Sequence, residues 1–230
     1  AQEIEKKLQN LEAVKRISLA GSIRRRRETV GDVDILVTSR QPLRVMNFFT
    51  ELAEVKRILA KGKTKSTVVL TNNLQVDLRV VEEESFGSAL QYFTGSKEHN
   101  IRLREMALAK NWKLSEYSLL DKETDERIAG ENEEEIYGAL GLNYIEPELR
   151  ENRGEIEASS EGRLPELVDY EKVKGDLHVH TTWSDGAHSI EEMAETAKSL
   201  GYEYLAICDH SQTLQIAHGL TEEDLRRQTE

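Results

Sequence analysis

The sequence predicts an α+β protein, a sheet backed by helices, followed by the first part of an α/β segment. Three observations predict this class. Short β-rich runs gather between residues 16 and 82, next to runs with apolar residues at helical spacing. Residues 86–140 combine helical runs with short extended ones. A strand–helix–strand pattern begins near residue 173. A chain of 230 residues has room for two or three small domains.

The elements of the sheet follow in chain order. Ile4, Leu8 and Leu11 are spaced as on one face of an amphipathic helix within residues 1–16. A proline near the start of 41–55, with apolar residues at helical spacing, predicts a second helix. Turn-like residues separate the β-rich runs. We therefore expect strands at 17–21, 33–37, 55–60, 66–71 and 74–81.

The later elements are shorter. Residues 86–110 read mostly as helix with a break at Thr-Gly-Ser, 112–128 as short strands, and 132–140 as an acidic helix. Residues 146–168 are polar, contain two of the three prolines, and indicate a linker or wrapping segment. From about residue 173, a strand, a helix at 189–200 and a strand at 204–210 predict a β-α-β unit.

Composition excludes several classes of protein. Hydrophobic residues make up 38% and charged residues 32%, and no apolar run approaches the roughly 18 residues of a membrane span. We expect no membrane partner. The single cysteine, Cys208, excludes an internal disulfide framework and favours a cytoplasmic protein.

The net charge of −12 is divided unevenly along the chain. Residues 1–110 carry 20 Lys and Arg against 14 Asp and Glu, net +6. Residues 111–230 carry the other 11 and 29, net −18. The basic half fits a phosphate-bearing ligand, and ordinary solvated charge explains the same division equally well.

Three aspartates form the first candidate site. Asp32 and Asp34 are two residues apart on a predicted strand, so their side chains share one face. Asp77 interrupts an apolar strand and completes a set of three if that strand lies beside residues 33–38. Neighbouring carboxylates repel unless protons or cations intervene, and oxygen ligands suit Mg²⁺. Two such ions promote in-line phosphoryl transfer, whereas an isolated D-x-D pair is often only an exposed strand face.

The segment before these aspartates fits a phosphate chain. Gly21 and Ser22 follow a strand, where a glycine lets the backbone approach an anion and the serine adds a hydroxyl group. Arg24 and Arg25 can supply charge-assisted hydrogen bonds. Together with the aspartates, they predict a metal–triphosphate ligand.

The stretch "GSIRRRRETVGDVDIL", followed by "VDLRVV", resembles the palm of the family X DNA polymerases. The resemblance implies that Asp32, Asp34 and Asp77 are the catalytic ligands of Mg²⁺ or Mn²⁺. It also implies that Ser22 and Arg25 contact the triphosphate and that Gly21 forms the turn.

The stretch "YFTGS", residues 92–96, resembles the family X motif beside the sugar of the incoming nucleotide. The resemblance implies that Tyr92 and Phe93 crowd the 2′ position and that Gly95 lets the chain bend close to the sugar. Asn100 then matches a contact to the incoming base, and Arg104 matches a contact to the template strand. These matches favour template-directed synthesis. An aromatic packing corner at a helix break is the structural alternative.

A second cluster contains histidines. "DLHVHTTWSDG" and "CDH" together resemble the PHP phosphoesterase domain that follows some family X polymerases. The resemblance implies that Zn²⁺ or Mn²⁺ ligands are His178, His180, Asp185 and His210. Asp209 is read as a surface or packing residue. Residues 173–230 supply only the first strands of such a domain, so we expect weak metal binding and no nuclease activity here.

We therefore expect a palm at 1–83, a thumb with nucleotide-selection residues at 84–150, a linker at 151–172, and the beginning of a PHP domain at 173–230. The expected function is template-directed DNA synthesis in gap-filling repair. The expected partners are dNTP and primer-template or gapped DNA, and we expect a monomer. Two alternatives remain: a template-independent nucleotidyltransferase, and a non-catalytic DNA-binding remnant. For the basic hairpin at 55–66, two interpretations stay open: its lysines and arginine contact DNA phosphates, or they are solvated turn residues.

Overall fold

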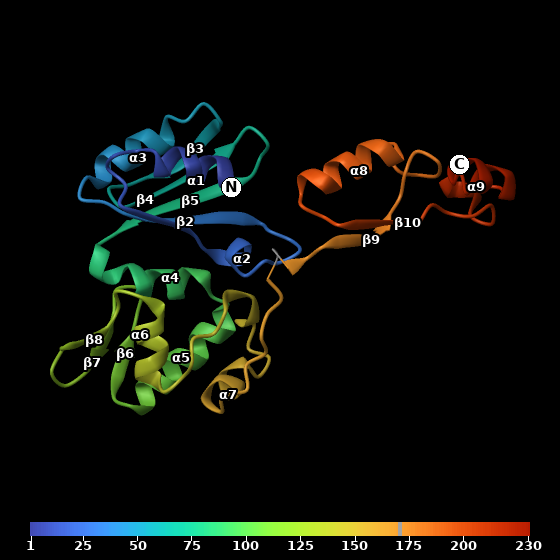
Figure 1. Ribbon diagram of the computed structural model, residues 1–230. Helices are drawn as coiled ribbons and strands as arrows, with labels where there is room; N and C mark the ends of the chain where they lie inside the picture. Colours follow the sequence, from blue (N-terminus) through green and yellow to red (C-terminus); the bar gives the residue numbers. More distant parts are fainter. Residues whose placement is uncertain (170–171) are drawn as a thin grey trace. The chain divides into compact units, whose positions relative to one another are not determined.

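The computed structural model describes residues 1–169 and 172–230. The chain divides into two compact units, Ala1–Leu164 and Pro165–Glu230, and each is described by itself (Figure 1). Residues 170 and 171, part of the expected linker, lie outside the described residues. In the described part of the chain, no helix has the length and apolar character needed to cross a membrane.

The first unit is built on a five-stranded sheet, as the sequence predicts. Its second and third strands in spatial order run parallel, and the other neighbouring strands are antiparallel. The spatial order is β1 (Arg16–Leu19), β2 (Asp32–Thr38), β5 (Gln75–Val81), β4 (Lys65–Leu70) and β3 (Val55–Lys61).

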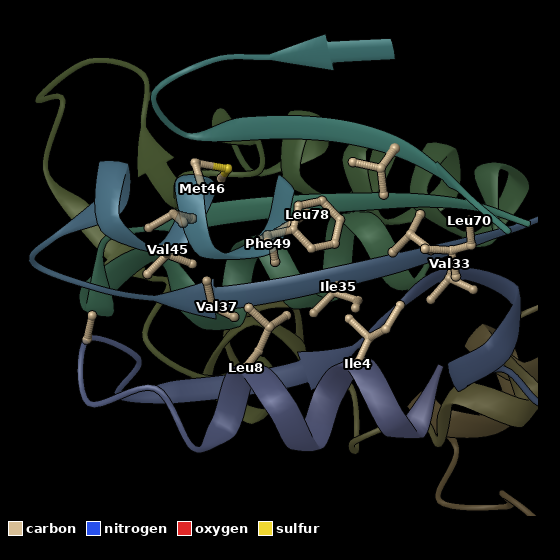
Figure 2. Close-up of a cluster of buried hydrophobic side chains, with 14 residues drawn as sticks. Ile4, Leu8, Val33, Ile35, Val37, Val45, Met46, Phe49, Leu70 and Leu78 are labelled. Atoms are coloured by element: carbon tan, nitrogen blue, oxygen red, sulfur yellow. The ribbon is translucent and has the colours of Figure 1, made fainter. Parts of the chain in front are cut away.

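Helices cover both faces of this sheet. On one face, α1 (Gln2–Gln9) and α3 (Pro42–Thr50) pack on alternate residues of β2, β4 and β5 (Figure 2). Ile4 and Leu8 of α1 and Phe49 of α3 lie in this core, at most 3% exposed. On the other face, α4 (Phe86–Thr94) packs on Leu36, next to the short helix α2 (Gly21–Arg24). α3 ends at Thr50, before the expected boundary, because residues 51–54 form turns.

The rest of the first unit forms a second core. It comprises α5 (Lys97–Ala109), the antiparallel strands β6 (Trp112–Leu114), β7 (Leu119–Asp121) and β8 (Arg127–Ala129), and α6 (Glu133–Leu140). Asn132 caps α6 through its side chain, and Gly141 ends it in the left-handed conformation. Two 3₁₀ turns flank this part, at Glu83–Ser85 and Pro147–Leu149.

The segment expected to be a linker contains a packed helix, α7 (Glu155–Ser160). Ile156 is buried in the second core, and the Ser159 hydroxyl donates to the backbone oxygen of Asn143 at 2.8 Å. Residues up to Leu164 therefore belong to the first unit. The polar composition of the segment hides this, because Ile156 is the only apolar residue among the three buried residues of the helix.

The second unit has a small sheet of two parallel strands, β9 (Gly175–Val179) and β10 (Tyr204–Ile207). Between them lies α8 (Ile190–Ser199), which starts with a capping box formed by Ser189 and Glu192. The last helix is α9 (Glu222–Gln228), after a 3₁₀ turn at Gln215–Ala217. The side chain of Leu177 on β9 is 67% exposed, so this sheet has little apolar cover.

Candidate active site

The three aspartates lie on neighbouring strands. β2 and β5 are parallel and in register, so that Asp34 is paired with Asp77. Asp32 lies two residues before Asp34 on the same face of β2. Val33 and Val76 alternate with them and are fully buried on the opposite face. The burial of the valines thus directs all three carboxylates to one side of the sheet.

The carboxylates affect one another. Burial, together with the negative charges of Asp32 and Asp77, raises the pKa of Asp34 to about 6. The positive charges of Arg79 and Lys65 oppose this rise. The carboxylate of Asp77 lies 3.4 Å from Lys65 Nζ and accepts a 3.3 Å hydrogen bond from Gln75 Nε2. The cluster therefore carries more negative charge than its neighbours neutralise.

A turn with a required glycine borders the carboxylates. Gly21 has φ +63°, and a Cβ atom there would lie 2.5 Å from Oδ2 of Asp34. The backbone N–H of Ala20 donates to the Asp34 backbone oxygen at 2.9 Å, which holds this turn on β2. Any larger residue at position 21 would displace the carboxylate, and Ser22 follows at the start of α2.

A cavity of about 400 Å³ opens beside the carboxylates and brings most of the predicted residues together. Asp77 is not among the lining residues, and its carboxylate lies 3.4 Å from Lys65 Nζ. The lining residues are Gly21, Ser22, Arg25, Asp32, Asp34, Tyr92, Phe93, Thr94, Gly95, Lys97, Asn100 and Arg104.

The break between α4 and α5 forms one wall of the cavity. Gly95 has φ +73°, and the Gly95–Ser96 peptide bond is cis. The rings of Tyr92 and Phe93 meet edge to face with centroids 5.0 Å apart. Asn100 donates to the Tyr92 backbone oxygen at 2.7 Å and accepts from the side chain of Gln91 at 2.6 Å. These bonds hold the side chain of Asn100 at the cavity wall.

The run of four arginines meets acids from distant parts of the first unit. Arg24, expected to help hold phosphates, forms two hydrogen bonds with Glu133, at 2.9 and 2.6 Å, and does not line the cavity. Arg25 lines the cavity, donates to Glu151 at 2.9 Å and also donates to the Thr94 backbone oxygen. The phosphate interpretation of Arg24 is therefore not favoured, and that of Arg25 remains a prediction.

Glu133 is a buried residue that the sequence did not indicate. It binds Arg24 on one side and Arg150 on the other, where the Nη1 to Oε1 distance is 2.5 Å. Burial favours the protonated form of Glu133, but the two arginines outweigh it and lower its pKa. Three consecutive glutamates begin α6, and only the first is buried, so no local pattern distinguishes it.

The basic hairpin at the sheet edge is exposed. β3 has no buried residue, and it pairs only with β4 among the described strands. Lys56 donates to Asn73 at 2.8 Å, and Lys65 lies near Asp77. DNA contact by this hairpin remains a prediction.

In the second unit, three of the four predicted ligands come together. His180, Asp185 and His210 each offer a ligand atom within 4.8 Å of the others. His180 Nδ1 lies 3.2 Å from Asp185 Oδ1, and His210 Nε2 lies 3.6 Å from Asp185 Oδ2. His178 is exposed and outside this group, although its ring centroid is 4.9 Å from that of His180.

Asp209 organises this second cluster. Its carboxylate accepts hydrogen bonds from the Thr181 backbone N–H at 2.7 Å, the Thr181 hydroxyl at 2.6 Å and the Ser184 hydroxyl at 2.5 Å. The turn that carries Asp185 is thus tied to the end of β10. The sequence alone indicates only a surface or packing role for Asp209. Its hydrogen bonds with Thr181 and Ser184 become evident only in the folded structure, because these residues lie 28 and 25 positions away in the chain.

Comparisons with known proteins agree with these features. The sequence matches the family models of the DNA polymerase beta palm over residues 1–104, the DNA polymerase beta thumb over 89–151, and the PHP domain over 176–223.

Among curated proteins, the chain is 44% identical over 230 residues to the DNA polymerase/3′-5′ exonuclease PolX of Bacillus subtilis. This alignment covers 99% of the chain and 40% of the relative, so the chain spans less than half of that relative's length. It is 28% identical over 143 residues to a repair DNA polymerase X of African swine fever virus, covering 59% of the chain and 82% of the relative.

Among solved structures, the fold is similar to a ternary complex of Leishmania infantum polymerase beta, with a TM-score of 0.58 and 24% identity. The match covers 65% of this chain and 73% of that one. At this identity the comparison supports the fold alone.

Proposed function

Because this chain belongs to the family X DNA polymerases, carrying a polymerase beta palm and thumb followed by the start of a PHP domain, we propose that it extends DNA primers by template-directed nucleotidyl transfer. The single observation that carries the proposal is the pairing of Asp34 with Asp77 on parallel strands, with Asp32 on the same face. The relatives that resemble it are named as DNA polymerases, two of them with a repair or exonuclease role in the name.

The residues present fit divalent metal ions. Three carboxylates supply only oxygen donors, and the pKa of Asp34 is raised by burial and then by the negative charges of Asp32 and Asp77, which a cation would offset. Asp32 and Asp34 would hold two Mg²⁺ or Mn²⁺ ions, and Asp77 would share one of them. When bound, such ions supply Lewis-acid stabilisation for attack of a primer 3′ oxygen on the α-phosphate, with pyrophosphate leaving.

The other residues of the cavity position the substrates. Ser22 and Arg25 lie where a hydroxyl group and a guanidinium can bind the phosphate chain. Tyr92, Phe93, Asn100 and Arg104 line the same cavity. We propose that the two aromatic rings contact the sugar and that Asn100 and Arg104 donate hydrogen bonds to the base pair. We propose dNTP and gapped or primer-template DNA as the substrates.

For the second unit, we propose a partial metal site. His180, Asp185 and His210 offer two imidazoles and a carboxylate, a donor set that suits Zn²⁺ or Mn²⁺. With three ligand groups that are partly exposed, we expect weak binding of these ions by this chain.

Primer extension tests the polymerase proposal. The 230-residue chain is incubated with a one-nucleotide gap, each dNTP in turn and Mg²⁺ or Mn²⁺. The wild type should add only the nucleotide complementary to the template, and Asp77→Asn should lower kcat/KM by about 10³-fold, several kcal/mol of transition-state stabilisation. The matched control is Asp125→Asn, because Asp125 is exposed in a turn with positive φ that asparagine tolerates.

Other outcomes point to other functions. Addition that ignores the template would indicate a template-independent nucleotidyltransferase. DNA binding without any addition would indicate a non-catalytic remnant. Equal activity of the wild type and Asp77→Asn would contradict the assignment of the carboxylates.

A further inference from the structure

A segment that follows the thumb holds two side chains beside the cavity. We call residues 150–160 the strap. The match to the thumb family ends at residue 151, so most of the strap lies beyond it. Two acids of the strap, Glu151 and Glu155, are four residues apart. Each binds a basic side chain, Arg25 and His99 respectively.

The first contact orients a residue of the cavity wall. Arg25 Nε donates to Glu151 Oε1 at 2.9 Å, and Arg25 Nη1 donates to the Thr94 backbone oxygen. The two side chains of the ion pair are only 15% and 19% exposed. Since a guanidinium has five N–H donors in one plane, these contacts fix the plane and leave donors for an anion. Arg27 also approaches Glu151, at 3.7 Å.

The second contact anchors the strap to α5. Glu155 Oε1 accepts from His99 Nδ1 at 2.7 Å, and these side chains are 5% and 0% exposed. His99 Nε2 lies 2.9 Å from the Tyr137 hydroxyl, which places the histidine between the strap and α6. Glu155 also accepts from the backbone N–H groups of Asn152 and Arg153, at 2.8 and 2.6 Å. His99 immediately precedes Asn100, a cavity residue.

The strap is attached at both ends. At its start, the Arg150 backbone oxygen accepts from the Ser96 backbone N–H at 2.9 Å, directly after the cis Gly95–Ser96 bond. At its end, Ile156 is buried in the second core. Glu151 is therefore carried by a segment fixed on either side, and it cannot follow Arg25 freely if that side chain moves.

From these contacts we propose that Glu151 is a positioning residue for the nucleotide phosphates: the strap, anchored through Glu155, holds Glu151 so that Arg25 presents its remaining donors to the cavity. This inference rests on the proposed function, because it takes Arg25 as a triphosphate contact. A guanidinium oriented in advance loses less side-chain entropy when it binds an anion, which favours affinity rather than the chemical step.

Three variants test it: Glu151→Ala, Glu151→Gln and, as a matched control, Glu157→Ala. Glu157 belongs to the same strap and pairs with Arg102 of α5 at 3.0 Å, but both side chains are more than 40% exposed and lie outside the cavity. Two measurements are made on each variant of the full chain: single-nucleotide insertion kinetics on gapped DNA, and calorimetric binding of inorganic tripolyphosphate. Thermal melting confirms that each variant is folded.

Glu151→Ala should raise KM for dNTP by about 10-fold and weaken tripolyphosphate binding by a similar factor, the loss expected for one charge-assisted contact, with kcat within about twofold. Glu151→Gln should recover most of the affinity, since its amide oxygen can still accept from Arg25 Nε. Glu157→Ala should match the wild type in both measurements.

An unchanged KM and unchanged tripolyphosphate affinity in Glu151→Ala would overturn the inference. Tighter binding in Glu151→Ala would overturn it too, because Glu151 would then compete with the phosphates for Arg25. If the wild type binds tripolyphosphate but extends no primer, the proposed polymerase function fails while the effect of Glu151→Ala on binding still decides the inference. If the wild type binds no tripolyphosphate, the inference fails.

Discussion

Two clusters of ionisable side chains in this protein contain the same sequence pattern, a pair of residues two positions apart on a strand. They differ in how well the sheet beneath them is packed. The first pair is Asp32 and Asp34 on β2, and the second is His178 and His180 at β9. In each pair, the alternation of a strand directs both side chains to one face of the sheet. The first pair lies on a five-stranded sheet with a buried apolar face. The second pair lies on a two-stranded sheet, where the side chain of Leu177 is 67% exposed.

This difference shows that a pattern of potential ligands in the sequence forms a well-ordered site only where the opposite face of the strand is packed. On β2, Val33, Ile35 and Val37 are at most 1% exposed on the far face, so the carboxylates point to the opposite side of the sheet. In the second unit, His180, Asp185 and His210 come together, whereas His178 stays exposed and outside the group. Strand alternation selects the face, and packing of the opposite face decides how closely the side chains are held.

The largest expected effect concerns the buried charges that support the first site. Glu133→Gln should destabilise the first unit by about 3 kcal/mol, because the fully buried guanidinium of Arg150 loses its counter-charge. The second unit should be unaffected. Urea unfolding can follow the units separately, since the two tryptophans, Trp112 and Trp183, lie one in each unit. Single-tryptophan variants assign the signals.

Glu134→Gln is the control for this change, because Glu134 is the exposed neighbour in the same helical turn. It should alter stability by less than about 0.5 kcal/mol. A loss below 1 kcal/mol for Glu133→Gln would show that the ionic network contributes little to the stability of the first unit and that the two clusters differ little in their support.

An intermediate effect depends on pH. Burial lowers the pKa of His99 from its ordinary value of 6.5, and this outweighs the hydrogen bond to Glu155, which raises it. Because the pKa of His99 is lower in the folded protein than in the unfolded chain, its contribution to the free energy of unfolding is fully present above pH 6.5. This contribution decreases as the pH falls below 6.5. The advantage of the wild type over His99→Gln should therefore shrink as the pH is lowered from 7.5 to 5.5, because the unfolded chain then binds a proton that the buried imidazole resists.

Other groups do not obscure this comparison. Asp34, with its raised pKa, makes stability fall as the pH rises from 3.8 to about 6, and this contribution cancels between the two proteins. Hydrogen bonds from His99 and backbone N–H groups outweigh burial and lower the pKa of Glu155, so its contribution is lost only below its ordinary value of 4.5. A stability gap that does not change with pH would show that His99 is not buried as a neutral side chain.

The smallest effect is expected in the second unit. His210→Ala should change the unfolding free energy reported by Trp183 by less than about 0.5 kcal/mol, because His210 is only partly buried and lies 3.6 Å from Asp185. A loss of more than about 2 kcal/mol would mean that the second cluster stabilises its unit as strongly as the buried ions stabilise the first.

The sequence predicted most of the sheet and the cavity wall. The expected strands at 33–37 and 74–81 are the parallel pair, and the helix break at residues 94–96 is where α4 meets α5. These features could be predicted because they depend on local periodicity and on glycine positions, and both can be read from a short stretch of sequence. The helix α7 was missed because its stretch is polar: of its three buried residues, only Ile156 is apolar.

The sequence by itself determined which side chains can share a face: Asp32 with Asp34 follows from a strand period of two. Only the tertiary structure decided which partner each charge takes. Arg24 and Arg25 are adjacent, yet one is held by Glu133, 109 residues away, and the other by Glu151, 126 residues away. Direction along a strand is set by neighbouring residues, whereas an ion pair forms wherever distant segments happen to pack, and their packing is a property of the whole chain.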